Sequence, residues 1–139
     1  MNRPERWLVA LLRLTALGTM LAVVPLVMPH AWWDWVHREM GLGPFPDTPA
    51  VDYLTRSVCA FYAMFGGLLW VVSRDVRRHA AVARYVAWVG AAFSVFITVL
   101  DALLRLPWYW TWVEGPLTIV VCAAILVLLA KVPADSPSP

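Results

Sequence analysis

This chain of 139 residues contains few charged side chains and only two cysteines, and both shortages exclude classes of protein. Charged residues make up 14% of the chain, and the formal net charge is +2. So small an excess of positive charge does not indicate a nucleic-acid partner, because binding to phosphates needs a concentrated basic surface. Cys59 and Cys122 form no C-x-x-C motif, so a thiol oxidoreductase is not expected.

The motifs of common catalytic sites are also missing. No serine lies in a G-x-S-x-G elbow, the turn that exposes the nucleophile of many hydrolases. No glycine-rich loop is present that would hold a phosphate group, and the pair Gly66-Gly67 lies within an apolar run, where glycines serve helix packing. The sequence therefore favours a protein that is not an enzyme, and it predicts no cofactor.

Apolar residues are abundant instead. They make up 61% of the chain, and the mean hydropathy is +0.68, whereas soluble domains are about 45–50% apolar. Several apolar runs are long enough to cross a bilayer as helices. We expect an all-α fold, a four-helix transmembrane bundle in up-down-up-down order with a short interfacial helix in the first outer loop. The expected bounds are about 7–28, 49–73, 82–104 and 107–131 for the spans and about 31–40 for the short helix.

The chain is expected to form one domain followed by a short tail. Residues 1–131 should form a single transmembrane domain, and residues 132–139, with three prolines and two serines, a disordered tail. The first apolar run, Trp7–Met28, is longer than the core of a usual signal peptide, and no A-x-A cleavage site follows it. We therefore expect this run to be retained as the first span.

The positions of the basic residues predict the orientation in the membrane. Loops on the cytoplasmic side carry an excess of lysine and arginine. Here the basic residues gather at the N-terminus, between the second and third runs and after the fourth. They are Arg3, Arg6, Arg74, Arg77, Arg78 and Lys131. We expect both termini to be cytoplasmic, in a bacterial inner membrane whose lipid bilayer is the main partner.

Three ionisable residues lie inside the expected spans, at matching depths. Arg56, Asp101 and Glu114 each lie 17 or 18 residues from a basic residue at the cytoplasmic end of the same span. That spacing corresponds to about 26 Å along a helix, nearly the thickness of the hydrocarbon core. Charge at this depth is costly unless it is paired, and it marks candidate functional sites. We expect the guanidinium of Arg56 to pair with both carboxylates near the outer face.

This cluster has more than one interpretation. As a structural clasp, it would determine which helices pack together. As a binding site in an outer-leaflet pocket, it would use Arg56 to hold a small anionic or amphiphilic molecule. An acidic pair could instead hold one proton, as in proton-coupled carriers. The neighbouring polar side chains expected to complete the cluster are Tyr53, Tyr62, Tyr109 and Arg105.

The short interfacial helix offers a candidate metal site. His30, Asp34 and His37 have i, i+4, i+7 spacing, which can place two imidazoles and one carboxylate on one helical face. The alternative is an ordinary polar face of a helix that lies in the headgroup region with its tryptophans towards the lipid. We prefer the alternative and predict no metal.

Several short sequence features resemble one group of known proteins. They include Arg56, Tyr62, Gly66-Gly67, the turn Asp75-Val-Arg-Arg78, the stretch GLGPFPDTPAVDYLTRS and the residues Asp101, Trp110 and Glu114-Gly115-Pro116. Together they resemble small bacterial four-helix membrane proteins of the DoxX-like kind. The resemblance implies the same four-helix bundle and transfers no catalytic residue.

For function, these observations favour a structural or accessory subunit of a membrane assembly. Its partner would be another membrane protein or a second copy of the chain. The first alternative is a binder or carrier of a small amphiphilic or anionic molecule at Arg56, Asp101 and Glu114. The second is a metal-dependent membrane enzyme that uses His30, Asp34 and His37.

Overall fold

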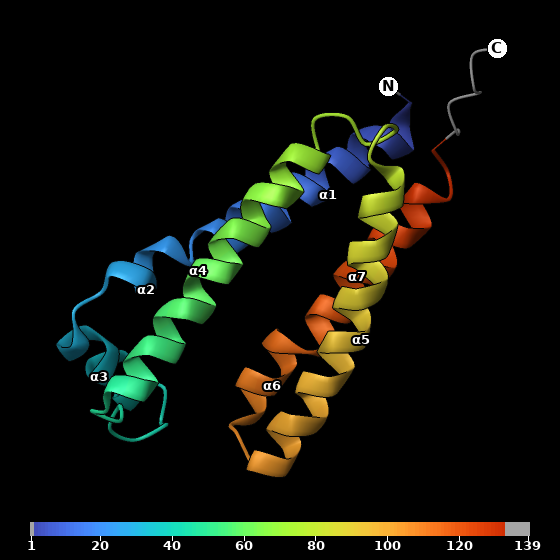
Figure 1. The fold of residues 1–139 in the computed structure, drawn as a ribbon. Helices are drawn as coiled ribbons and strands as arrows, with labels where there is room; N and C mark the ends of the chain where they lie inside the picture. The colour runs from blue at the N-terminus through green and yellow to red at the C-terminus, as the bar shows by residue number, and fades with distance from the viewer. Residues whose placement is uncertain (1, 133–139) are drawn as a thin grey trace. The chain divides into compact units, whose positions relative to one another are not determined.

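The computed structural model describes residues 2–132, and the regular secondary structure in this part of the chain is helical (Figure 1). Helices account for 79% of the structure, and no strand occurs among the residues described. Of the tail expected over residues 132–139, all but Val132 lies outside the described range. The helices are α1 (Arg3–Met20), α2 (Val23–Val27), α3 (His30–Glu39), α4 (Pro49–Val72), α5 (Ala80–Leu104), α6 (Trp108–Glu114) and α7 (Pro116–Leu129).

Four helical segments are long and apolar enough to cross a bilayer. They are Arg3–Val27, Pro49–Val72, Ala80–Leu104 and Trp108–Leu129. The expectation of an all-helical fold with four candidate spans is thus confirmed. Large apolar side chains, among them Trp88, Phe96 and Leu103 of α5, are exposed along these segments. Such extensive apolar exposure is typical of helices that face lipid.

The chain divides into two compact units, which we describe one at a time. The first unit consists of the chain up to Leu14 together with the chain from Leu69 onward, and the second is Thr15–Leu68. The single domain expected over residues 1–131 stays a prediction.

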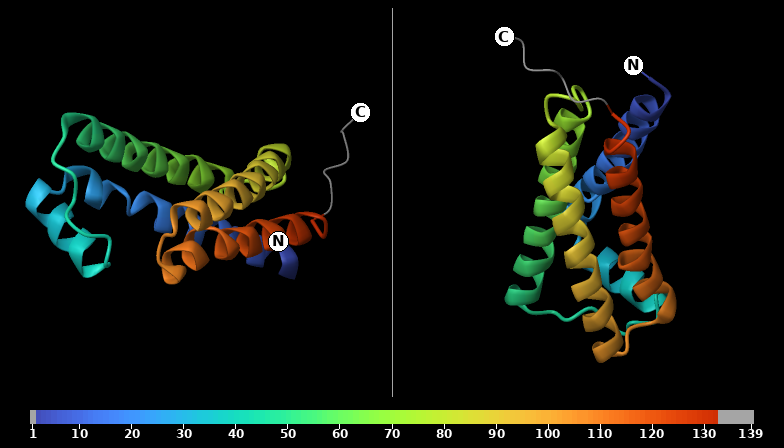
Figure 2. Two further views of the ribbon diagram at one scale, coloured as in Figure 1. Left: turned by 90° about the horizontal axis from the view of Figure 1, so that it is seen from below. Right: turned by 90° about the vertical axis from the view of Figure 1, so that its right-hand side faces the viewer.

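In the first unit, α5 packs against α6 and α7, and both views of Figure 2 show α5 and α7 side by side. Glycines allow this close approach. A methyl group on Gly115 would clash with the hydroxyl of Thr98 and would lie 3.3 Å from the carbonyl oxygen of Ser94. A methyl group on Gly90 would lie 3.0 Å from the sulfur of Cys122. Small residues at such positions let helix backbones approach closely in lipid.

In the second unit, Gly66 brings α4 close to the C-terminal part of α1. A Cβ atom on Gly66 would lie 2.6 Å from the carbonyl oxygen of Ala16, from Thr19 Oγ1 and from a side-chain carbon of Met20. The adjacent Gly67 has nothing within 4 Å of a Cβ atom at its position. The two glycines therefore have different roles, and only Gly66 lies at the helix contact.

The first span differs from the continuous helix expected over residues 7–28. It begins at Arg3 and is interrupted between α1 and α2. Pro25 has no N–H, so it cannot donate the usual helical hydrogen bond to the carbonyl of Leu21. That carbonyl accepts the N–H of Val24 instead, at 2.9 Å. The tighter turn that results separates the two helices.

The fourth span, expected over residues 107–131, is also interrupted. Helix α6 ends at Glu114, Gly115 follows, and α7 begins at Pro116. Pro116 cannot donate a hydrogen bond to the carbonyl of Trp112, and the loss of that bond favours a kink beside Glu114. The interruption lies at that place.

The remaining helices begin and end close to their expected bounds. Helix α4 spans Pro49–Val72 and so ends one residue before the expected residue 73. Thr48 caps its start, because its hydroxyl accepts the N–H of Val51 at 3.3 Å. Helix α5 begins two residues before the expected residue 82 and ends at the expected residue 104. Helix α3 ends one residue before the expected residue 40, and Gly41 follows with a φ of 70°.

Candidate functional site

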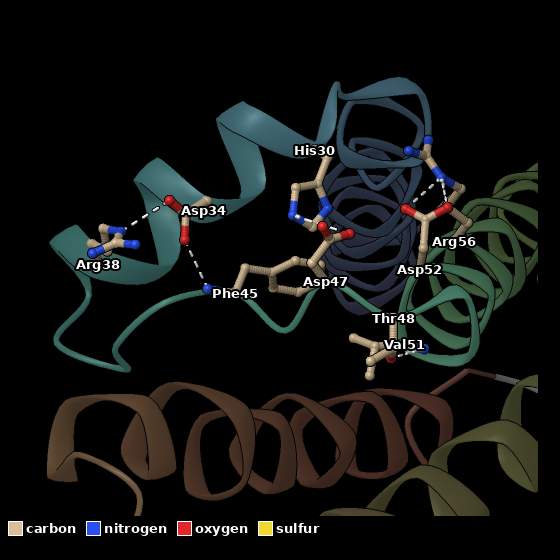
Figure 3. Close-up of polar contacts among 9 residues, drawn as sticks. All are labelled: His30, Asp34, Arg38, Phe45, Asp47, Thr48, Val51, Asp52 and Arg56. Carbon is tan, nitrogen blue, oxygen red and sulfur yellow. Dashed lines mark hydrogen bonds and ion pairs between the residues drawn. The ribbon is translucent and has the colours of Figure 1, made fainter.

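Arg56 of α4 is held by three groups of the second unit. Its Nε donates to both oxygens of Asp52, at 3.1 and 3.0 Å (Figure 3). Its Nη1 donates to the carbonyl of Leu26 at 2.7 Å, and its Nη2 donates to the carbonyl of Met28 at 3.1 Å. Asp52 and Arg56 share one face of α4 because they are four residues apart.

The two carbonyls that Arg56 binds belong to the end of α2. The last carbonyls of a helix have no partner within the helix, and Pro29, which follows Met28, has no N–H to offer. Arg56 supplies donors to Leu26 and Met28, and Asp52 neutralises its charge. The arrangement therefore stabilises the end of a helix in a candidate membrane span, and unpaired carbonyls are costly in hydrocarbon.

The sequence predicted other partners for Arg56. Asp101 and Glu114 belong to the first unit, so their pairing with Arg56 stays a prediction. Sequence reasoning overlooked Asp52 as a partner, although its i, i+4 spacing from Arg56 was visible in the sequence.

Asp101 of α5 is a deeply buried carboxylate in the first unit. The residue is only 4% exposed, and its Oδ2 has no hydrogen-bond partner within the described chain. Glu114 is the last residue of α6, which packs against α5. Its Oε2 accepts the indole N–H of Trp110 at 2.6 Å. Both residues thus lie in the first unit on neighbouring helices, and their pairing stays a prediction.

The other predicted members of the cluster lie at more exposed positions. Tyr53, Tyr62 and Tyr109 are all exposed. Arg105 ends α5 in the left-handed backbone conformation, with a φ of 55°, and its own N–H bonds to the carbonyl of Ala102 at 3.3 Å. Arg105 therefore has a local role in ending the helix.

The two histidines considered as metal ligands, His30 and His37, lie against an aromatic ring. The rings of His30 and His37 each lie 5.4 Å from the ring of Phe45, and the indole of Trp33 stacks on it at 5.5 Å. His37 Nδ1 also bonds to the carbonyl of Gly43 at 3.1 Å. Phe45 thus occupies the space beside both imidazoles. No group of three metal-binding side chains occurs in the described part of the chain.

Asp34 joins α3 to the loop that follows it. Its Oδ2 accepts the Nε of Arg38, and its Oδ1 accepts the backbone N–H of Phe45, both at 2.9 Å (Figure 3). The hydrogen bond from Arg38 holds the pKa of Asp34 below its usual value of 3.8, and the Phe45 N–H acts in the same direction. The carboxylate is therefore a structural link between the helix and the Phe45 loop.

The structure also contains an ion pair that the sequence did not predict. Glu5 of α1 accepts from Arg77 at two atoms, Nε at 3.0 Å and Nη2 at 2.9 Å. Glu5 is buried, and Arg77 lies in the link between α4 and α5. Both residues belong to the first unit. Because they are 72 positions apart, no local spacing rule could have identified the pair.

Comparison of the chain with family models, curated proteins and solved structures gives no match. The resemblance to DoxX-like proteins accordingly stays a prediction.

Proposed function

We propose that this protein is a small multi-pass membrane protein with a structural or accessory role in a membrane assembly. Its partner is another membrane protein or a second copy of the chain. We further propose that its spans form a four-helix bundle with both termini in the cytoplasm of a bacterial cell. The observation that carries this proposal is the use of Arg56, whose guanidinium is committed to Asp52 and to two helix-end carbonyls.

The pair formed by Glu5 and Arg77 supports the same proposal. In both cases a charged side chain near a membrane span bonds to other groups of the chain, and this use of charge stabilises the fold. A binding site, by contrast, needs polar groups that are available to a ligand. A protein that uses these charges internally and whose apolar side chains are widely exposed is suited to packing against lipid and other helices.

Native mass spectrometry from mild detergent tests the accessory role. We expect the chain to be released with a stoichiometric protein partner or as a defined multimer. The matched control is harsh detergent, which should yield the single chain from the same preparation. A single chain in mild detergent that carries one stoichiometric small molecule would contradict the accessory role and support a binder.

The alternative function, a binder of an anionic or amphiphilic molecule, has its best structural support away from Arg56. A groove of about 340 Å³ is lined by Arg3, Arg6, Trp7 and Ala10 of α1. Neither guanidinium forms an ion pair or hydrogen bond within residues 2–132. In the mass-spectrometry experiment, a retained anionic lipid that is lost in an Arg3→Gln, Arg6→Gln double variant would favour this alternative.

A further inference from the structure

The groove on α1 combines two arginines with apolar side chains. We propose that it binds one anionic phospholipid, whose phosphate lies on Arg3 and Arg6 and whose glycerol and acyl chains lie along Trp7 and Ala10. This site names the ligand class for the binder alternative given above. It rests on the proposed location of the chain in a membrane, but it does not need the accessory role and exists with or without a protein partner.

The residues that line the groove share one face of α1. They are Arg3, Arg6, Trp7 and Ala10. Counted from the first of them, the spacing is i, i+3, i+4 and i+7, which is a single face of an α-helix. The volume of about 340 Å³ is within the range of pockets that hold small ligands. Leu8 and Leu12, on the other face of α1, have no exposed surface, so the groove lies on the outward face of the helix.

The acidic residue between the two arginines does not neutralise them. Glu5 is only 5% exposed, and its two carboxylate oxygens accept from Arg77 at 3.0 and 2.9 Å. Neither Arg3 nor Arg6 has an ion pair or a side-chain hydrogen bond within residues 2–132. The long-range pair of Glu5 and Arg77 therefore leaves both guanidiniums of the groove available to an anion.

The third arginine of α1 is already engaged. The guanidinium carbon of Arg13 lies 5.6 Å from the centre of the Trp70 ring, which is a cation–π contact. The available positive charge of α1 is therefore concentrated at Arg3 and Arg6. A ligand in the groove meets its cationic partners at one end only.

The position of the groove along the helix matches the layers of a lipid leaflet. A candidate membrane span, Arg3–Val27, begins at the groove, so the groove belongs at the boundary between headgroups and hydrocarbon. Helical side chains lean towards the N-terminus of their helix, so Arg3 and Arg6 extend towards the headgroups. The side chain of Trp7 is 66% exposed, and indoles favour this boundary.

The chemistry of the lining favours an amphiphile over a free anion. Guanidiniums bind phosphate oxygens through charge-assisted hydrogen bonds, often two at a time. Beside them, Ala10 offers only a methyl group, and Leu14, one turn further along, is exposed and extends the apolar surface. A free phosphate would use the arginines alone. An anionic phospholipid uses the guanidiniums and the apolar surface together.

Titration of the full chain in detergent with phosphatidylglycerol, followed by native mass spectrometry, tests the site. At an ionic strength of about 0.15 M charges are screened over about 8 Å, so the measurement favours direct contacts over long-range attraction. We expect one bound lipid per chain. The Arg3→Gln, Arg6→Gln double variant should weaken binding at least about tenfold, because losing one charge-assisted hydrogen bond already has about that effect.

The matched control removes the same charge outside the groove. Arg74 and Arg78 are exposed in the link between α4 and α5, the same link whose Arg77 binds Glu5 of α1. We expect Arg74→Gln, Arg78→Gln to retain most of the affinity, and circular dichroism checks that both double variants are folded. Equal losses in the two double variants would overturn the site, because they would show only the diffuse attraction of a basic surface.

Two further ligands separate an anionic phospholipid from other sources of phosphate. Phosphatidylcholine has a phosphate and acyl chains but no net charge, and glycerophosphoglycerol is the headgroup of phosphatidylglycerol without acyl chains. We expect both to bind more weakly than phosphatidylglycerol. Equal binding of glycerophosphoglycerol would assign the groove to free phosphate esters, and equal binding of phosphatidylcholine would remove the role of negative charge. Either result would overturn the proposal.

The same spectra distinguish this site from the accessory role. A complex with a protein partner that carries one phosphatidylglycerol per chain supports both. A complex with a partner but without bound lipid, even at excess phosphatidylglycerol, overturns the lipid site alone. A single chain with one bound lipid supports the site and contradicts the accessory role.

Discussion

Two arginine–aspartate pairs with the same i, i+4 spacing lie in different surroundings in the second unit. The Nε–Oδ2 distance is 3.0 Å for Arg56 and Asp52 and 2.9 Å for Arg38 and Asp34. The Arg56 side chain is 34% exposed, whereas that of Arg38 is 59% exposed. Arg56 alone also bonds to two backbone carbonyls. Comparing the two pairs therefore measures how much the less exposed arginine, with its additional bonds to backbone carbonyls, contributes to the stability of the fold.

Replacing Arg56 should destabilise the protein far more than replacing Arg38. Arg56→Leu leaves the Asp52 carboxylate and the carbonyls of Leu26 and Met28 without their donors, so we expect the unfolding temperature in detergent to fall by several degrees. Arg38→Leu removes an exposed pair, which contributes little, and serves as the control. Thermal unfolding followed by circular dichroism measures both effects.

A lysine at position 56 separates charge from hydrogen bonding. Arg56→Lys keeps the positive charge but cannot reach the carboxylate and both carbonyls with the planar fork of a guanidinium. We expect a stability between those of the wild-type protein and Arg56→Leu. Equal effects of Arg56→Leu and Arg38→Leu would show that the carbonyl contacts contribute nothing.

At the scale of the helices, a glycine at a contact position allows two neighbouring helices to pack more closely. Gly115 faces Thr98 and Ser94 without space for a methyl group, whereas Gly67 faces open space. Gly115→Ala should lower the free energy of unfolding by about 1–3 kcal/mol, because extra volume in a packed contact forces the helices apart. Gly67→Ala should be neutral or stabilise by up to about 1 kcal/mol, because alanine favours a helix more than glycine does.

Denaturation in the same detergent compares the two alanine variants. A second substitution, Thr98→Ala, removes the clashing hydroxyl and should restore part of the stability lost in Gly115→Ala. If Gly115→Ala were as stable as Gly67→Ala, the close contact between α5 and the interruption would be disproved. A double-mutant cycle of Gly115→Ala and Thr98→Ala gives the coupling free energy between the two positions.

Acid should loosen the link between α3 and the Phe45 loop. Because the pKa of Asp34 is lowered in the folded state, its stabilising contribution is present above the unfolded pKa of 3.8. The contribution is lost as the pH falls through the lower folded-state pKa. We expect the amide of Phe45 to exchange its hydrogen faster below that range, as measured by mass spectrometry. In Asp34→Asn, exchange should already be faster at neutral pH and should depend less on acid.

For the whole molecule, the orientation in the membrane can be measured directly. Asp47 lies between α3 and α4, and Arg78 lies between α4 and α5. Each is replaced singly by cysteine in a chain whose buried cysteines, Cys59 and Cys122, are alanine. If both termini are cytoplasmic, a membrane-impermeant thiol reagent should label intact cells at position 47 only. Labelling at position 78 only would show the opposite orientation, with both termini outside the cytoplasm. Permeabilised cells provide the control.

The spans and α3 could be predicted because their causes are local. A membrane helix needs about 20 apolar residues, and the sequence contains four such runs. The interruption at Gly115 follows from Pro116 in the same way. The interruption before Pro25 was not expected, because a proline near a helix end can be accommodated without a break. In this chain the helix is interrupted because the carbonyl of Leu21 accepts the N–H of Val24 in a tighter turn.

The charged groups were harder to predict because depth alone does not select a partner. The depth rule grouped Arg56 with Asp101 and Glu114, but it did not weigh Asp52, which the same helix supplies at shorter range. The pair of Glu5 and Arg77 depends on the folded path of the chain, which no spacing in the sequence reveals. Asp101 and Glu114 lie on α5 and α6, two helices of the first unit that pack against each other, and the pairing of their side chains stays a prediction.

The local pairing of Arg56 with Asp52 has a consequence for biosynthesis. A guanidinium that enters the hydrocarbon alone opposes insertion of its segment. Here the counter-ion is four residues away, so the charge is neutralised as soon as one turn of α4 has formed. The nascent segment can therefore leave the translocation channel as an electrically neutral helix, before any later span has been synthesised.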